Sequence, residues 1–205
     1  IWVAKKRYIL NAHDVEGVRY KEPKLKIMGV EAVKSSTPAA CREKIKDALK
    51  IIMTKDNQEL NSFIQDFRKD FMDLKPELIA YPRSVNGLNK WTESHNLFKK
   101  GAPIHCKGAI LYNHLLQDKK LQNKYPYIQE GDKIKFLHMK TPNVYQSTSI
   151  SFMTKLPNEL NLHNFIDYDM QFEKSFVEPL KFITDIIRWQ IDSSYGTQGT
   201  LEGFF

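Results

Sequence analysis

Two consecutive stretches, residues 39–54 and 57–74, repeat apolar side chains at intervals of three and four residues. That interval matches the 3.6-residue turn of an α-helix, so each stretch predicts an amphipathic helix with one buried face. Thr37 and Pro38 are suited to the N-cap and first position of the first helix. The predicted buried side chains are Cys41, Ile45, Ala48, Leu49, Ile52, Leu60, Phe63, Ile64, Phe67, Phe71 and Leu74.

The rest of the chain predicts a small β start and further helices. Residues 1–30 are strand-like around a turn at 14–17, which predicts a hairpin, and Pro23 is expected to interrupt its return. The other expected elements are a connecting region over 75–101, a helix over 104–116, a strand over 131–138 and a helical element over 164–191 that breaks or kinks at Pro179. The predicted fold class is α+β, mainly α-helical, with an N-terminal β-hairpin followed by a helical part.

Composition narrows the function classes. The chain has 205 residues, is 41% hydrophobic and carries a net charge of +7, which favours a globular protein with a polyanionic partner. Cys41 and Cys106 show no metal-ligand spacing, which indicates neither a zinc site nor a disulfide and predicts a reducing, intracellular setting. No apolar run approaches the ~20 residues of a membrane span, and no signal peptide opens the chain, so no membrane partner is expected. The strand-like start at Ile1 suggests a piece of something longer.

A run of basic residues, Lys5-Lys6-Arg7, followed by Tyr8, lies within the first expected strand. Strand alternation would place Lys6 and Tyr8 on one face and Lys5 and Arg7 on the other. Both faces would then be basic or hydrogen-bonding, which favours a polyanion alongside. The alternative is a solvated edge strand that lysines protect from pairing with another chain.

The last residues combine a polar stretch with an apolar end. Leu201 lies three and four positions before Phe204 and Phe205, so one helical turn would gather the three side chains, with Gln198 at the edge. The stretch before them is polar and aperiodic, which predicts a flexible tail over 192–205. This QxxLxxFF pattern resembles the sliding-clamp-binding peptide of replication enzymes. A frayed terminus, or a tail folded back on the core, is the alternative.

Several segments in consistent order resemble family B replicative DNA polymerases of the T-even-type phages. They are the KKRY strand, residues 22–29, residues 34–38, the Pro103-to-Gly108 segment, residues 167–180 and the tail. The resemblance implies the C-terminal part of such a polymerase. The implied domains are the last palm strand and hairpin at 1–30, a helical thumb subdomain at 31–191 and the clamp-binding tail at 192–205.

The resemblance also implies roles for particular residues. Those expected to contact DNA phosphates, minor-groove acceptors or the sugar edge are Lys5, Lys6, Arg7, Tyr8, Lys24, Lys26, Lys34, Ser35, Ser36, Thr37, His105 and Lys107. Lys107 stands where the family has Arg, which keeps the charge but loses the bidentate fork. Those expected to bind the clamp are Gln198, Leu201, Phe204 and Phe205. Ordinary helix capping is the alternative for residues 34–37, and ordinary packing is the alternative for His105.

The catalytic motifs of the family, including the YxDTDS-type aspartates, do not occur in this sequence. Asp167 and Asp169 lie two apart on an expected helix and do not face one site, so neither is assigned to a metal. The chain alone is therefore expected to be inactive and to hold no cofactor, while Mg²⁺ is implied for the full polymerase. The expected partners are double-stranded primer–template DNA, a sliding clamp and the remainder of the polymerase, namely palm, fingers and exonuclease domain, in the host cytoplasm if the chain is phage-encoded.

Two rival interpretations stay open. The chain could be a separately encoded, non-catalytic subunit that binds DNA and a clamp. It could also be a helical protein-binding scaffold whose basic surface is incidental, in which case it would not retain DNA at low salt.

Overall fold

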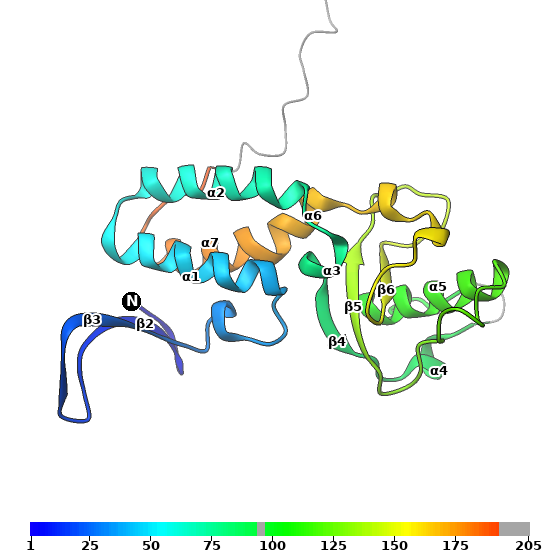
Figure 1. The fold of residues 1–205 in the computed structure, drawn as a ribbon, viewed down its shortest axis with the longest axis horizontal. Helices are drawn as coiled ribbons and strands as arrows, with labels where there is room; N and C mark the ends of the chain where they lie inside the picture. Colours follow the sequence, from blue (N-terminus) through cyan, green and yellow to red (C-terminus); the bar gives the residue numbers. More distant parts are fainter. Residues whose placement is uncertain (94–96, 193–205) are drawn as a thin grey trace, which may run out of the picture. The chain divides into compact units, whose positions relative to one another are not determined.

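The structure is a computed structural model that describes residues 1–93 and 97–192 (Figure 1). The described residues pack as two compact units. The first unit comprises Ile1–Lys34, Cys41–Asp73 and the described residues from Phe172 onward, and the second comprises Ser35–Ala40 and Leu74–Gln171. Two small antiparallel sheets and several helices confirm the predicted α+β class, with an N-terminal hairpin followed by helices.

The first unit opens with an antiparallel sheet of strand order β1-β2-β3. Its strands are β1 (Trp2–Ala4), β2 (Arg7–Val15) and β3 (Val18–Met28). Glu16 and Gly17 join β2 to β3 with φ angles of 54° and 81°. Positive φ at both positions is the geometry of a two-residue turn that matches the strand twist, so the predicted hairpin is confirmed.

Two details of the predicted hairpin are wrong. Lys5 and Lys6 form a turn between β1 and β2 and do not lie inside a strand, so the alternation argument for these two lysines does not apply. Lys6 has a φ of 62°, which a strand cannot accommodate. Pro23 does not interrupt β3, because the ladder shifts register between Ala12 and Asp14 on the opposite strand.

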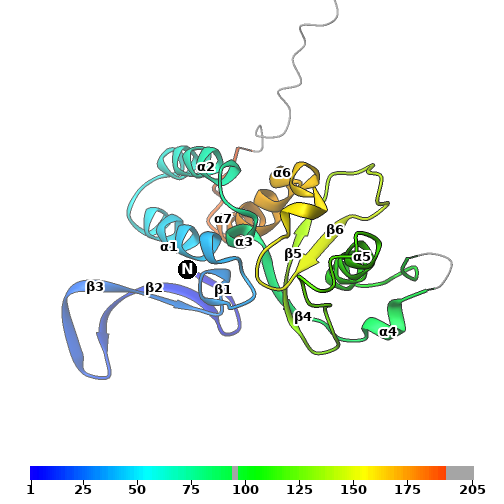
Figure 2. The same cartoon turned by 45° about the vertical axis from the view of Figure 1, so that its right-hand side comes forward.

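Helices α1 (Ala39–Thr54), which lies in the first unit from Cys41 onward, and α2 (Asn57–Met72) agree with the two predicted segments. Asp56 caps α2 by accepting a hydrogen bond of 2.9 Å from the backbone N–H of Glu59. All five predicted core residues of α1 are buried, as are Leu60, Ile64, Phe67 and Phe71 of α2. Figures 1 and 2 show α1, α2 and α7 (Glu178–Thr184) lying side by side.

The predicted helical element over 164–191 is shorter and more varied than expected. It consists of α6 (Tyr168–Phe172), a π-helical segment (η4, Glu173–Val177) and α7 (Glu178–Thr184). Pro179 has no N–H to donate and its ring would crowd the carbonyl one turn earlier. A break or kink was predicted at Pro179, but the helix continues through it, and a wider π turn lies immediately before it.

Phenylalanines form the core of the first unit. Phe67 lies 4.7 Å from Phe176 and 5.8 Å from Phe172, measured between ring centroids, and Phe71 lies 5.1 Å from Phe172. The first and third of these pairs meet nearly edge to face, an arrangement worth about 0.5–1.5 kcal/mol beyond area burial. The core therefore joins α2 to the helix that begins some hundred residues later in the chain.

The second unit contains a sheet of strand order β4-β5-β6, formed by β4 (Tyr81–Ser84), β5 (Lys133–His138) and β6 (Ser149–Phe152). Only β5 was predicted. The remaining short elements are η1 (Glu31–Val33) in the first unit, and α3 (Pro76–Ile79), α4 (Leu88–Trp91), η2 (Asn158–Leu160) and η3 (His163–Phe165) in the second.

Helix α5 (Ile104–Asp118) packs directly on β6. A Cβ atom at Gly108 would lie 2.6 Å from the backbone nitrogen of Ser151, so only glycine allows this approach. The hydroxyls of Ser149 and Ser151 donate to the carbonyls of Ile104 and His105 at 2.6 and 2.8 Å. The first turn of α5 is therefore fixed to the strand. Within the described parts of the chain, no helix has the length and apolar character needed to cross a bilayer.

Candidate nucleic-acid interface

The predicted DNA-binding residues at the start of the chain lie around one end of the first sheet. Lys5 and Lys6 are exposed in the β1–β2 turn, and the half-buried Tyr8 follows in β2. The rings of Tyr8 and Trp2 stack across the two strands, with centroids 5.3 Å apart and planes 13° from parallel. Two ammonium groups and an aromatic pair therefore share this end of the sheet.

Lys24 and Lys26 extend the basic surface along β3. Both are exposed, and their cross-strand partners are Ala12 and Leu10. Residues two apart on a strand share a face, so Lys24 and Lys26 lie on the face that also carries Tyr8. The ammonium group of Lys24 lies 4.1 Å from the ring centre of Tyr20. We call the surface formed by Lys5, Lys6, Tyr8, Lys24 and Lys26 the hairpin face.

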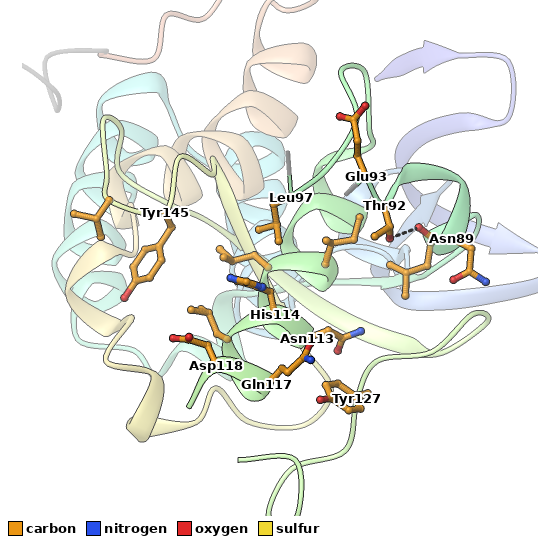
Figure 3. A pocket seen from close by; sticks show the side chains of 15 residues that line it. Asn89, Thr92, Glu93, Leu97, Asn113, His114, Gln117, Asp118, Tyr127 and Tyr145 are labelled. Carbon is orange, nitrogen blue, oxygen red and sulfur yellow. Dashed lines mark hydrogen bonds between the residues drawn. The ribbon is translucent and has the colours of Figure 1, made fainter. Parts of the chain in front are cut away.

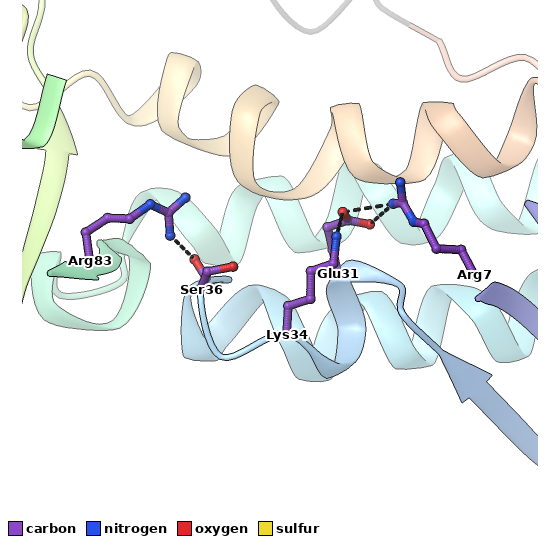
Figure 4. Close-up of polar contacts among 5 residues, drawn as sticks. All are labelled: Arg7, Glu31, Lys34, Ser36 and Arg83. Carbon is purple, nitrogen blue, oxygen red and sulfur yellow. Dashed lines mark hydrogen bonds and ion pairs between the residues drawn. The ribbon is translucent and has the colours of Figure 1, made fainter. Parts of the chain in front are cut away.

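Arg7 is held by a carboxylate within the same unit. Its Nη2 donates to both carboxylate oxygens of Glu31, at 3.0 and 2.9 Å, and Lys34 donates to Glu31 Oε1 at 2.7 Å (Figure 4). The guanidinium also lies 4.8 Å from the ring centre of Phe182. Glu31 thus lowers the net charge that Arg7 and Lys34 present, and their contact with DNA stays a prediction.

The Ser35–Thr37 segment belongs to the second unit. Arg83 Nη1 donates to the carbonyl of Ser36 at 2.9 Å (Figure 4). Ser35 and Ser36 are exposed, whereas Thr37 is only 5% exposed. The hydroxyls of Ser35 and Ser36 are accessible to a phosphate, while that of Thr37 is largely covered by the protein.

His105 and Lys107 lie on the first turn of α5. Burial, and then the charge of Arg83, lower the pKa of His105 below its ordinary value, so this imidazole is mainly neutral at pH 7. Lys107 borders a recess of about 620 Å³, and its ammonium lies 5.6 Å from the ring centre of Phe98. The positive charge near this turn therefore comes from Lys107 and Arg83 and not from the histidine.

Two more lysines line the same recess and were not predicted from the sequence as site residues. Lys99 and Lys100 are exposed and line it together with Lys107. We call Lys99, Lys100 and Lys107 the lysine recess. The pair of lysines directly before Gly101 was the available signal, but it lay in a segment without periodicity.

A larger cavity of about 840 Å³ lies beside α5, and none of the predicted site residues lines it (Figure 3). Its wall carries the carboxylates of Glu93 and Asp118. The side chain of Asn113 is already used, because it donates to and accepts from the backbone of Ile128 at 2.8 Å each. Glu93 also borders the lysine recess, but among the described residues no lysine or arginine lines the larger cavity, so that cavity offers a phosphate no cationic partner.

Two further expectations concern metal and clamp. Among residues 1–93 and 97–192, no three His, Cys, Asp or Glu side chains gather where they could hold a metal ion. The expectation of Mg²⁺ concerns the full polymerase and stays a prediction. Gln198, Leu201, Phe204 and Phe205 lie outside the described residues.

The hairpin face and the lysine recess carry exposed lysines, which are suited to contact phosphates. Clusters of this kind are typical of nucleic-acid-binding proteins. The chain is similar to the DNA-directed DNA polymerase of Enterobacteria phage T4, with 31% identity over 183 residues, 87% of this chain and 20% of that protein. It is 34% identical over 188 residues to the DNA-directed DNA polymerase of Escherichia phage RB69, which covers 89% of this chain and 20% of that protein.

These similarities confirm the resemblance to phage DNA polymerases that the motifs indicated. The chain spans about one fifth of the length of the curated relatives it matches. No family model matches it.

Proposed function

We propose that the chain is the C-terminal part of a family B replicative DNA-directed DNA polymerase, with residues 1–30 ending the palm and 31–191 forming the thumb. In this role it grips primer–template duplex DNA during replication inside the host cell. The observation that carries the proposal is the similarity to two phage DNA polymerases over 87% and 89% of the chain.

The chemistry of the hairpin face supports a grip on duplex DNA that does not depend on sequence. Lysines bind backbone phosphates and the minor-groove acceptors that all correct base pairs share. The hairpin face offers four exposed lysines, Lys5, Lys6, Lys24 and Lys26, within one unit. Such contacts would hold a duplex of any sequence in the position needed for synthesis.

The reaction itself is assigned to the rest of the polymerase. The palm aspartates and their Mg²⁺ would align the primer hydroxyl with the incoming nucleotide. This chain would contribute binding and orientation of the duplex and would synthesise no DNA alone.

The tail would tether the polymerase to a sliding clamp through Gln198, Leu201, Phe204 and Phe205. Two weak contacts on one duplex raise each other's effective concentration, so the pair holds the enzyme on DNA far longer than either alone. Replacing Phe204 and Phe205 by Ala should weaken DNA retention only when the clamp is present.

The experiment is a titration of primer–template DNA at several salt concentrations. Lys24→Ala with Lys26→Ala should reduce the salt slope by about two, because each lost phosphate contact releases one counterion fewer. The matched control is Lys50→Ala with Lys69→Ala, which removes two exposed lysines that pair with Asp47 and Asp66. An affinity that does not change with salt concentration would contradict the proposed DNA grip. An equal reduction of the salt slope in the control variant would contradict it as well.

A second candidate is a separately encoded, non-catalytic DNA- and clamp-binding subunit of a split polymerase. The YxDTDS-type motif is absent from these 205 residues, which is expected both for such a subunit and for a fragment of a single polymerase. The reading frame upstream of Ile1 distinguishes the two, because a continuous frame with that motif supports a single polymerase.

A further inference from the structure

Gly29, which follows β3, touches the β1–β2 turn more closely than any other residue type could. It has a φ of +65°, and a Cβ atom there would lie 2.3 Å from the carbonyl oxygen of Lys6 and 3.1 Å from Cγ of Arg7. No Cβ atom tolerates the shorter distance. We call the turn formed by Lys5 and Lys6 the lysine turn, and its backbone is seated directly against Gly29.

The lysine turn holds an unfavourable backbone conformation. Lys6 lies in the left-handed region, at φ 62°, where a residue with a side chain is strained. The ladder pair Ala4 and Arg7 closes the turn on either side of Lys5 and Lys6. Strain of this kind persists only where the surroundings hold it, and here Gly29 provides the space.

The aromatic pair Trp2 and Tyr8 lies at the same end of the sheet, and the two rings stack. Trp2 is 68% exposed, so its indole adds little to the core, yet it covers one face of the Tyr8 ring. Tyr8 is in turn the cross-strand partner of Met28, the residue before Gly29. The Trp2–Tyr8 stack and the lysine turn thus flank the same end of β3.

We propose that the lysine turn and Tyr8 form one preorganised contact for duplex DNA, in which Gly29 and Trp2 are positioning residues. Gly29 sets where the two ammonium groups stand, and Trp2 fixes the ring of Tyr8. The contact requires no base-specific partner, because its groups suit phosphates and the sugar edge. This inference rests on the proposed function and adds the two residues that position the lysine turn and the ring of Tyr8.

The first test compares two glycine substitutions in the same hairpin. Gly29→Ala should displace the turn, weaken duplex binding about tenfold and lower the salt slope by one to two, because the ammonium groups lose their phosphates. Gly17→Ala is the matched control: Gly17 also has a positive φ, +81°, but a Cβ atom there would meet nothing within 4 Å. It should leave the affinity and the slope unchanged.

The second test addresses Trp2 without a clash in the fold. Trp2→Ala should weaken duplex binding several-fold with an unchanged salt slope, because the loss lies in the orientation of Tyr8 and not in charge. Trp2→Phe retains an aromatic partner and should restore most of the affinity. Thermal unfolding of the intact 205-residue chain, measured for each variant, separates these effects from a loss of structure.

The outcomes distinguish a failure of the proposed function from a failure of this inference. If the unaltered chain fails to bind duplex DNA at low salt, the proposed function is wrong. If it binds but Gly29→Ala matches it in affinity and slope, or Gly17→Ala loses as much, the inference is wrong. Should Gly29→Ala fail to fold, the Trp2 pair decides: equal binding by Trp2→Ala and Trp2→Phe overturns the positioning role.

Discussion

The carboxylate of Glu31 accepts two hydrogen bonds, 3.0 and 2.9 Å long, from a single guanidinium nitrogen of Arg7, 24 residues earlier in the chain. The side chains of Arg7 and Glu31 are 28% and 22% exposed, so this ion pair is largely shielded from water. It ties the start of β2 to the helical turn η1. It also places one negative charge beside the basic residues that are proposed to face DNA.

Replacing Glu31 by Gln should therefore strengthen DNA binding while it weakens the fold. The change removes the carboxylate that offsets Arg7 and Lys34, so duplex affinity should rise several-fold at low salt. Loss of a charge-assisted pair should lower the free energy of unfolding by about 1–3 kcal/mol. Glu43→Gln, on an exposed position of α1, is the control for net charge. Weaker DNA binding by Glu31→Gln would contradict this role.

Phe67 stands at the centre of the aromatic core. Phe67→Ala should lower the free energy of unfolding by about 3–5 kcal/mol, because the ring loses its contacts with Phe71, Phe172 and Phe176 and leaves a cavity. Urea denaturation measures the change. Phe182→Ala, at a position 48% exposed, should cost clearly less, and equal losses for the two variants would contradict the assignment of the core.

Gly108 tests the contact between α5 and β6. Gly108→Ala places a Cβ atom 2.6 Å from the backbone nitrogen of Ser151, so the helix must move away from the strand. We expect a loss of about 1–3 kcal/mol, as for other overpacked sites, although Ala is the better helix former. Gly131→Ala, where a Cβ atom meets nothing within 4 Å, should cost only its backbone strain. Unchanged stability of Gly108→Ala would show that the two elements lie further apart.

Glu159 should titrate at unusually low pH. Hydrogen bonds from Lys124, from its own backbone N–H and from the Tyr125 hydroxyl lower the pKa of this carboxyl to about 2. Because its pKa in the folded state is depressed, its contribution to stability is present above the unfolded value, about 4.3. That contribution is lost as the pH falls through about 2. NMR titration measures the shift, and Lys124→Ala should raise the pKa toward the ordinary value.

The periodic helices were predictable because their own sequences contain the reason for their burial. Ile45 and Leu49 recur at the helical interval, and both are fully buried. Strand β4 was not predictable, because it has four residues and contains Pro82, which a strand tolerates only at an edge. Its pairing partner β5 lies some fifty residues away, so no local sequence pattern predicts the pairing.

The candidate site divides in the same way. Lys5, Lys6, Lys24 and Lys26 could be nominated from sequence because resemblance and charge singled them out. The partner of Arg7 could not, since a salt bridge between Arg7 and Glu31 follows from packing and not from spacing. Gly29 could not either, because only the structure shows which carbonyl its missing side chain would strike.

The chain enters the first unit twice before its last return at Phe172. During synthesis, α1 and α2 therefore emerge about a hundred residues or more before α6 and η4, which supply Phe172 and Phe176. Until then Phe67 lacks its contacts with Phe172 and Phe176, and Phe71 lacks its contact with Phe172. Forming these contacts carries the entropic penalty of closing a long loop. Nascent chains that stop near residue 171 should consequently bind hydrophobic dyes and chaperones, and the unit should become protease-resistant only after α7 has left the ribosome.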